Sequence, residues 1–82
     1  MLNTKLITEN IEINPRVMLG KPVIKGTRVT VELILEKLSC GESFDEILAE
    51  HPRLRHEHIL AALAYAATSL RGETFIPIAA AA

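Results

Sequence analysis

The chain has 82 residues, a net charge of −1 and a single cysteine, Cys40. These values exclude several large domains and an intramolecular disulfide framework, and one unpaired cysteine fits a reducing cytosol. The first ten residues show no signal-peptide pattern and no stretch holds 18 consecutive apolar residues, so we expect a cytoplasmic protein without a membrane span. Because hydrophobic residues make up 49% but aromatic residues only 4%, the core must be aliphatic. Such a short chain buries a modest core, which favours oligomerisation.

Charge is divided unevenly along the chain. Residues 1–28 contain five basic and two acidic side chains, whereas residues 29–82 contain four basic and eight acidic ones. The first part, with a net charge of +3, is suited to a polyanion, and the second part, with −4, is not. Because the charges are few, ordinary scatter of surface charge explains this uneven distribution equally well.

The N-terminal third predicts a small β-sheet. Residues 6–13 are rich in β-branched side chains, partly alternate in polarity and are followed by an Asn-Pro turn, which is typical of a strand. Residues 22–24 and 28–29 are predicted to form short strands around Gly26, which supplies the positive φ that a tight turn needs. We therefore expect a sheet of two or three strands.

Two amphipathic helices are predicted next. Over residues 31–39 the apolar side chains recur at the i, i+3, i+4, i+7 spacing of a helix face, and Thr30 is a favourable N-cap. Gly41 is the expected stop of this helix. The second helix starts at Ser43, whose spacing from Glu46 is that of a capping box.

A third predicted helix, residues 56–70, is apolar on most of its surface. A helix that is apolar on most sides is buried on most sides, and a large exposed apolar patch would be a liability. We therefore predict a homodimer whose interface is formed by this helix through Ile59, Leu63, Ala66 and Leu70. A short sheet followed by three helices with short turns is consistent with a helix-turn-helix core.

The segment from Gly20 to Val31 combines two glycines, a proline and three basic residues, and it leads directly into the first helix. Its basic side chains lie close to the amide groups of a helix N-terminus, where a phosphate is favoured. Arg55 precedes the third helix, whose first turn is its most polar part. We predict nucleic-acid contacts at Lys21, Lys25, Arg28 and Arg55. The alternative for Arg28 is an ion pair with an acidic residue such as Glu32.

No pattern indicates an enzyme, a metal site or a cofactor. The histidines of His56-Glu57-His58 are two residues apart, whereas a metalloprotease helix needs them four apart, so we expect exposed histidines near a helix end. Cys40 has no second cysteine at zinc-ligand spacing, and we expect it to pack beside a helix end. We therefore expect no catalytic residues, no metal and no cofactor.

Several motifs follow one another over roughly residues 7–67: Asn14-Pro15, Gly20-Lys21-Pro22-Val23-Ile24-Lys25-Gly26-Thr27-Arg28-Val29, Gly41-Glu42-Ser43, and His51-Pro52-Arg53-Leu54. In this combination the chain resembles the bacterial domain-of-unknown-function family 433. The resemblance implies a homeodomain-like or winged-helix-like helix-turn-helix fold and a role as an antitoxin encoded beside a PIN-like ribonuclease toxin. Arg55 departs from the family, which usually has Thr or Ser there, and this implies a weaker helix cap or a different surface contact.

The fold expected overall is mainly α, with a small N-terminal β-hairpin before a three-helix core in a domain of residues 1–71. The function expected is that of an antitoxin, which sequesters a PIN-like toxin and helps to repress its own operon. Two alternatives stay open, a stand-alone DNA-binding repressor and a structural dimeric module without DNA contact. The apolar third helix and the negative net charge favour the module over the repressor.

Residues 72–82 form a tail beyond this domain. Its apolar side chains are too many for a free tail, while Pro77 argues against a central strand. We predict that the tail binds the toxin through Glu73, Phe75, Ile76 and Ile78, by adding to a sheet edge or filling a groove. The alternative is that Phe75 and Ile76 fold back onto the protein's own core.

Overall fold

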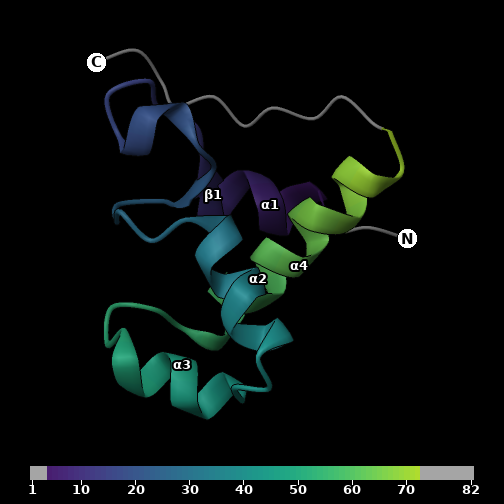
Figure 1. Cartoon of the computed structure of the whole chain (residues 1–82). Helices are drawn as coiled ribbons and strands as arrows, with labels where there is room; N and C mark the ends of the chain where they lie inside the picture. Colours follow the sequence, from purple (N-terminus) through teal and green to yellow (C-terminus); the bar gives the residue numbers. More distant parts are fainter. Residues whose placement is uncertain (1–3, 73–82) are drawn as a thin grey trace.

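The structure, a computed structural model, describes residues 4–72. These residues form a mainly helical protein with one two-stranded antiparallel sheet (Figure 1), which confirms the expected class at this level. None of the helices in this part of the chain is long and apolar enough to cross a membrane. The elements in chain order are α1 (Thr4–Asn10), β1 (Ile11–Glu12), the 3₁₀ turn η1 (Met18–Gly20), β2 (Val23–Ile24), α2 (Val31–Ser39), α3 (Phe44–Glu50) and α4 (His56–Leu70).

The strand predicted over residues 6–13 is wrong for most of its length, because its first half belongs to helix α1. The side chains of Thr8 and Asn10 donate hydrogen bonds to the carbonyls four residues earlier, at 2.8 and 2.9 Å. Ile7 is fully buried where α1 packs on α4. This tertiary packing outweighs the β-propensity of the branched side chains, which is a weak and context-dependent preference.

The small sheet joins β1 to β2, with Ile11 opposite Ile24. The strand predicted at residues 28–29 is reduced to a single antiparallel bridge, in which Thr30 lies opposite Val23. The Ile24 N–H donates to the Val29 carbonyl and the Val31 N–H to the Pro22 carbonyl, both at 2.9 Å. Gly26 takes a φ of +79°, as the predicted turn requires. The first two predicted strands are therefore present in shortened form, as β1 and β2. The predicted turn at Gly26, which follows β2, is confirmed.

The three later helices begin and end where the sequence places them. Thr30 Oγ1 accepts the Leu33 N–H at 3.0 Å and so caps α2. At α3 the Glu46 N–H donates to Ser43 Oγ at 3.1 Å, and the Ser43 N–H donates to the Glu46 carboxylate at 2.9 Å. The hydrogen bond from the Ser43 N–H, followed by the interaction with the Ser43 side chain, lowers the pKa of the Glu46 carboxyl. Gly41 follows α2 with a φ of +89°.

Isoleucine dominates the core, as the aliphatic composition predicts. Two alanines of α4, Ala61 and Ala62, are fully buried beside it, and their small side chains let α4 lie closely across α1 and α2 (Figure 1). The surface of α4 that faces away from this core keeps large apolar side chains exposed. The fully buried isoleucines are Ile7, Ile11, Ile24, Ile34, Ile47 and Ile59.

The start of α4 carries a cap that its sequence does not announce. The Arg55 N–H donates to His58 Nδ1 at 2.9 Å, so a histidine at the third helical position does what the Glu or Gln of a capping box usually does. This bond requires an unprotonated Nδ1. Burial lowers the pKa of His58; the charge of Glu57 opposes this in part, and the charge of Arg55 adds a smaller lowering effect. Unlike the exposed histidine that the sequence predicts, His58 is partly buried.

We expect this cap to make stability depend on pH. Because the pKa of His58 is lower in the folded than in the unfolded chain, its contribution is complete above the unfolded value of about 6.5 and is lost as pH falls through the folded value. Urea unfolding at pH 7.5 and pH 5.0 will show about 1 kcal/mol more loss for the wild type than for His58→Gln. The glutamine amide can accept the same bond without titrating in this range, so equal pH dependence in both proteins would contradict the assignment.

Candidate anion-binding cleft

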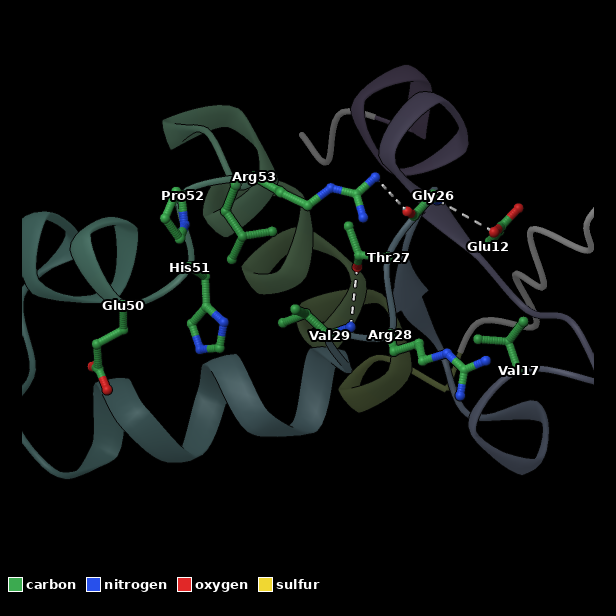
Figure 2. A pocket seen from close by; sticks show the side chains of 11 residues that line it. Glu12, Val17, Gly26, Thr27, Arg28, Val29, Glu50, His51, Pro52 and Arg53 are labelled. Atoms are coloured by element: carbon green, nitrogen blue, oxygen red, sulfur yellow. Dashed lines mark hydrogen bonds between the residues drawn. The ribbon is translucent and has the colours of Figure 1, made fainter.

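Two loops that are distant in sequence face each other across an open cleft of about 550 Å³. One loop, residues 25–29, follows β2 and leads to α2, and the other, residues 51–54, joins α3 to α4. Figure 2 shows the side chains that line the cleft. They are Glu12, Val17, Gly26, Thr27, Arg28, Val29, Glu50, His51, Pro52, Arg53 and Leu54.

Each loop brings one arginine to this cleft. Arg53 Nη2 donates to the Gly26 carbonyl at 3.1 Å, which ties the two loops together (Figure 2). Arg28 is exposed on the loop that Arg53 holds. Within that loop Thr27 Oγ1 accepts the Val29 N–H at 3.0 Å, so the backbone beside Arg28 is fixed by its own hydrogen bonds.

The two acidic residues in the lining both accept hydrogen bonds within the protein, and the bond of Glu12 lies within the cleft itself. The Glu12 carboxylate accepts the Gly26 N–H at 3.5 Å, and the Glu50 carboxylate accepts from Lys37 Nζ at 3.0 Å. Within residues 4–72 no carboxylate forms an ion pair with Arg28 or Arg53. The cleft therefore presents two guanidinium groups that no ion pair among residues 4–72 engages, and such groups bind carboxylates and phosphates in bidentate geometry.

Glu50 belongs to a charged triad that links α2 to α3. Its hydrogen bond with Glu42, followed by that with Lys37, lowers the pKa of Glu50, while the bond with Glu50 raises the pKa of Glu42. The hydrogen bond to Glu50 also raises the pKa of Lys37, against the smaller opposing effect of desolvation. Glu50, which lines the cleft, is thus paired with Lys37 of α2.

The cations predicted to contact nucleic acid do not form one patch. Lys21 Nζ lies 3.1 Å from the Glu32 carboxylate, so this lysine makes the ion pair that the sequence offered as an alternative for Arg28. Lys25 Nζ donates to a carbonyl of α1 at 3.4 Å. The guanidinium of Arg55 lies 3.9 Å from the Glu57 carboxylate at the start of α4. Only Arg28 among the four lines the cleft.

Arg53 was missed by the sequence prediction. It lies 25 residues from Arg28, and no local spacing rule links two such loops. The only signal is the proline before it, which marks a fixed turn between α3 and α4. The partnership of the two arginines depends on how the loops pack.

A second, apolar depression of about 650 Å³ lies between α2 and α4, and we call it the α2/α4 groove. Of the residues predicted for a dimer interface, Ala66 and Leu70 line this groove, Leu63 is 39% exposed, and Ile59 is fully buried in the chain's own core. A second copy would therefore meet Leu63 and Leu70 and not Ile59. The groove is lined by Lys21, Pro22, Val31, Glu32, Leu35, Glu36, Ser39, Tyr65, Ala66, Ser69 and Leu70.

The remaining sequence predictions concern Cys40, a metal site and the C-terminal tail. Cys40 was expected to pack beside a helix end but is exposed where α2 ends. In the part of the chain that the structure describes, no three His, Cys, Asp or Glu side chains are arranged to hold a metal ion. The residues predicted to bind a partner, Glu73, Phe75, Ile76 and Ile78, lie outside the described residues.

Comparison with known proteins places the chain in a family. The model of the family described as "Protein of unknown function (DUF433)" matches residues 11–66, which include both loops of the cleft. The crystal structure of a DUF433 member protein from Anabaena variabilis ATCC 29413, at 2.00 Å resolution, is similar with a TM-score of 0.73 and 28% sequence identity, covering 84% of this chain and 68% of that one. No curated protein shows a significant match. The chain belongs to the DUF433 family of proteins of unknown function.

Proposed function

We propose that this protein is a non-enzymatic antitoxin that binds and inhibits a PIN-like ribonuclease encoded beside it. The observation that carries the proposal is the cleft in which Arg28 and Arg53 have no carboxylate partner among residues 4–72. Two such guanidinium groups on fixed loops form a site for an anionic group of another molecule.

A ribonuclease that uses metal ions provides such groups. Carboxylates hold the ions in sites of this kind, and arginine pairs with a carboxylate through two parallel hydrogen bonds. In this proposal Arg28 and Arg53 contact acidic residues of the toxin, and the bound protein blocks access of RNA to the nuclease site. The bond from Arg53 to the Gly26 carbonyl fixes the arginine before binding, which lowers the entropic cost of the complex.

The proposal is tested by co-expression. We expect the product of the adjacent gene to arrest growth when expressed alone, and the wild-type protein to restore growth and to co-purify with it. A matched pair of variants controls for the site: Arg28→Ala with Arg53→Ala lies in the cleft, and Lys5→Ala with Arg16→Ala removes two exposed basic residues outside its lining. Restoration of growth by the cleft variant at wild-type levels would place the contact elsewhere.

A second candidate function is repression of its own operon. Helices α2, α3 and α4 follow one another with short turns, as in a helix-turn-helix domain, and Arg28 and Arg53 would contact phosphates without reading sequence. Exposed acidic residues on α3, Asp45 and Glu46, disfavour a close approach of this helix to DNA. We therefore expect weak operator binding in which the arginine pair accounts for roughly two units of the salt slope, measured by titration at several salt concentrations.

We further propose that the protein acts as a homodimer through the exposed face of α4. Leu60 and Leu63 are 41% and 39% exposed and lie three residues apart on this face. A negatively charged side chain at position 63 would be buried without a partner in such an interface. Light scattering at micromolar concentration is expected to give a dimeric mass for the wild type and a monomeric mass for a folded Leu63→Glu variant. A monomeric wild type would contradict this arrangement.

A further inference from the structure

The α2/α4 groove is an open depression lined mainly by apolar side chains. Leu35 and Tyr65 contribute to it from the two helices, and Leu70 stands at the end of α4 with 89% of its surface exposed. Of the three charged residues in the lining, Lys21 and Glu32 form an ion pair with each other, and Glu36 is the third. This groove therefore offers an occupant apolar contacts and little net charge, which fits an apolar segment and not a phosphate or an acidic peptide.

The chain itself supplies such a segment next to the groove. The described residues end at Gly72, two positions after Leu70, and ten residues follow. Within them Phe75, Ile76 and Ile78 are large and apolar, and Glu73 is the only ionisable side chain. Gly72 has a φ of +77°, the left-handed conformation with which a chain commonly turns away at a helix C-terminus.

The length of the tail suits the groove. The side of α2 that lines it runs from Val31 to Ser39, and eight helical steps of about 1.5 Å give a length of about 12 Å. An extended chain advances about 3.3 Å per residue, so residues 73–78 span about 20 Å. The tail can therefore leave α4 at Gly72 and place its apolar residues along the groove.

We propose that residues 75–78 of the same chain occupy the α2/α4 groove, with Phe75 and Ile76 packed against Leu35 and Tyr65. A segment tethered a few residues from its site has an effective concentration in the millimolar range, which favours it over the tail of a second copy. Pro77 has no N–H to donate, so it suits side-chain packing in a groove better than addition to a sheet edge. The proposal goes beyond the antitoxin function and assigns the tail to the protein's own surface.

Tyr65 reports directly on the groove. It is the single tyrosine of a chain that has no tryptophan, so its fluorescence can be followed without labelling. Deletion of residues 73–82 is expected to raise the acrylamide quenching constant of this fluorescence at least twofold and to lower Tm by about 5 °C or more, as loss of a large buried side chain does in a domain of this size. Deletion of residues 79–82 alone removes four alanines and is expected to change neither value.

Two further measurements keep the proposal open to failure. The full-length double variant Phe75→Ser with Ile76→Ser should reproduce the effect of the long deletion, and nuclear Overhauser contacts should connect the Phe75 ring to Leu35 and Tyr65. Unchanged quenching and Tm in the long deletion would overturn the proposal. It would equally be overturned if contacts to Phe75 appeared only between differently labelled copies, or if the long deletion abolished toxin binding while Tm stayed the same.

Discussion

Replacement of Ala62 by glutamate is expected to unfold the protein. Ala62 is fully buried on α4, at the surface that packs on α1 and α2. A glutamate there both overfills a closely packed contact and buries a carboxylate without a partner. Each effect costs several kcal/mol, and domains of this size have a total stability of only about 5–15 kcal/mol. Far-UV circular dichroism of the purified variant will show loss of helical signal at 25 °C.

The neighbouring position provides the matched control. Leu63→Glu introduces the same side chain into the same helix, one residue further along, where 39% of the leucine is exposed. We expect this variant to keep its helical signal, with a change in unfolding free energy within about 1 kcal/mol at protein concentrations where the chain is monomeric. A folded Ala62→Glu protein would show that α4 does not pack through its alanines.

The second large effect is expected on partner binding. Reversal of both charges in the cleft, Arg28→Glu with Arg53→Glu, is expected to weaken binding of the adjacent gene product at least 100-fold, measured by isothermal titration calorimetry. Hydrogen bonds to charged groups contribute about 1.5–3 kcal/mol each, and about 1.4 kcal/mol corresponds to a tenfold change in Kd. Like charges placed opposite the toxin's carboxylates would add repulsion to this loss.

Two controls separate the cleft from general electrostatic attraction. Arg55→Glu changes the charge of a side chain that is 78% exposed and lies outside the cleft lining, and it is expected to alter Kd less than about threefold. Arg28→Lys with Arg53→Lys keeps the charge but loses the planar fork of donors, and we expect an intermediate loss. A Kd for the charge-reversed protein equal to that of the wild type would exclude the cleft from the interface.

Local signals explain why the second half of the fold could be predicted. The signals that begin and end a helix act within one helical turn of their own position. In the structure Thr30 caps α2, Ser43 and Glu46 cap α3, and Gly41 follows the end of α2. The amphipathic spacing of apolar residues over 31–39 also indicates the helix α2, from a pattern that extends over about two turns. These helices can therefore be predicted without knowing which residues they pack against.

The structure of the N-terminal part could not be predicted in the same way, because it depends on contacts with residues distant in sequence. Residues 4–10 carry β-branched side chains, and their helix is stabilised by packing on α4, about fifty residues later. The capping role of His58 was equally hidden, because histidine is not among the residues that usually cap at this position. Arg28 could be proposed from its own turn, whereas Arg53 joins it only through the hydrogen bond between two loops.

Inhibition of the purified nuclease tests the central claim most directly. The product of the adjacent gene is incubated with a fluorogenic RNA substrate while this protein is added in increasing amounts. We predict that the wild type abolishes cleavage at a stoichiometric ratio, and that the folded Arg28→Glu, Arg53→Glu variant leaves cleavage unchanged at the same concentrations. Cleavage that persists with an excess of the wild type, or equal inhibition by both proteins, would contradict the role assigned to the cleft.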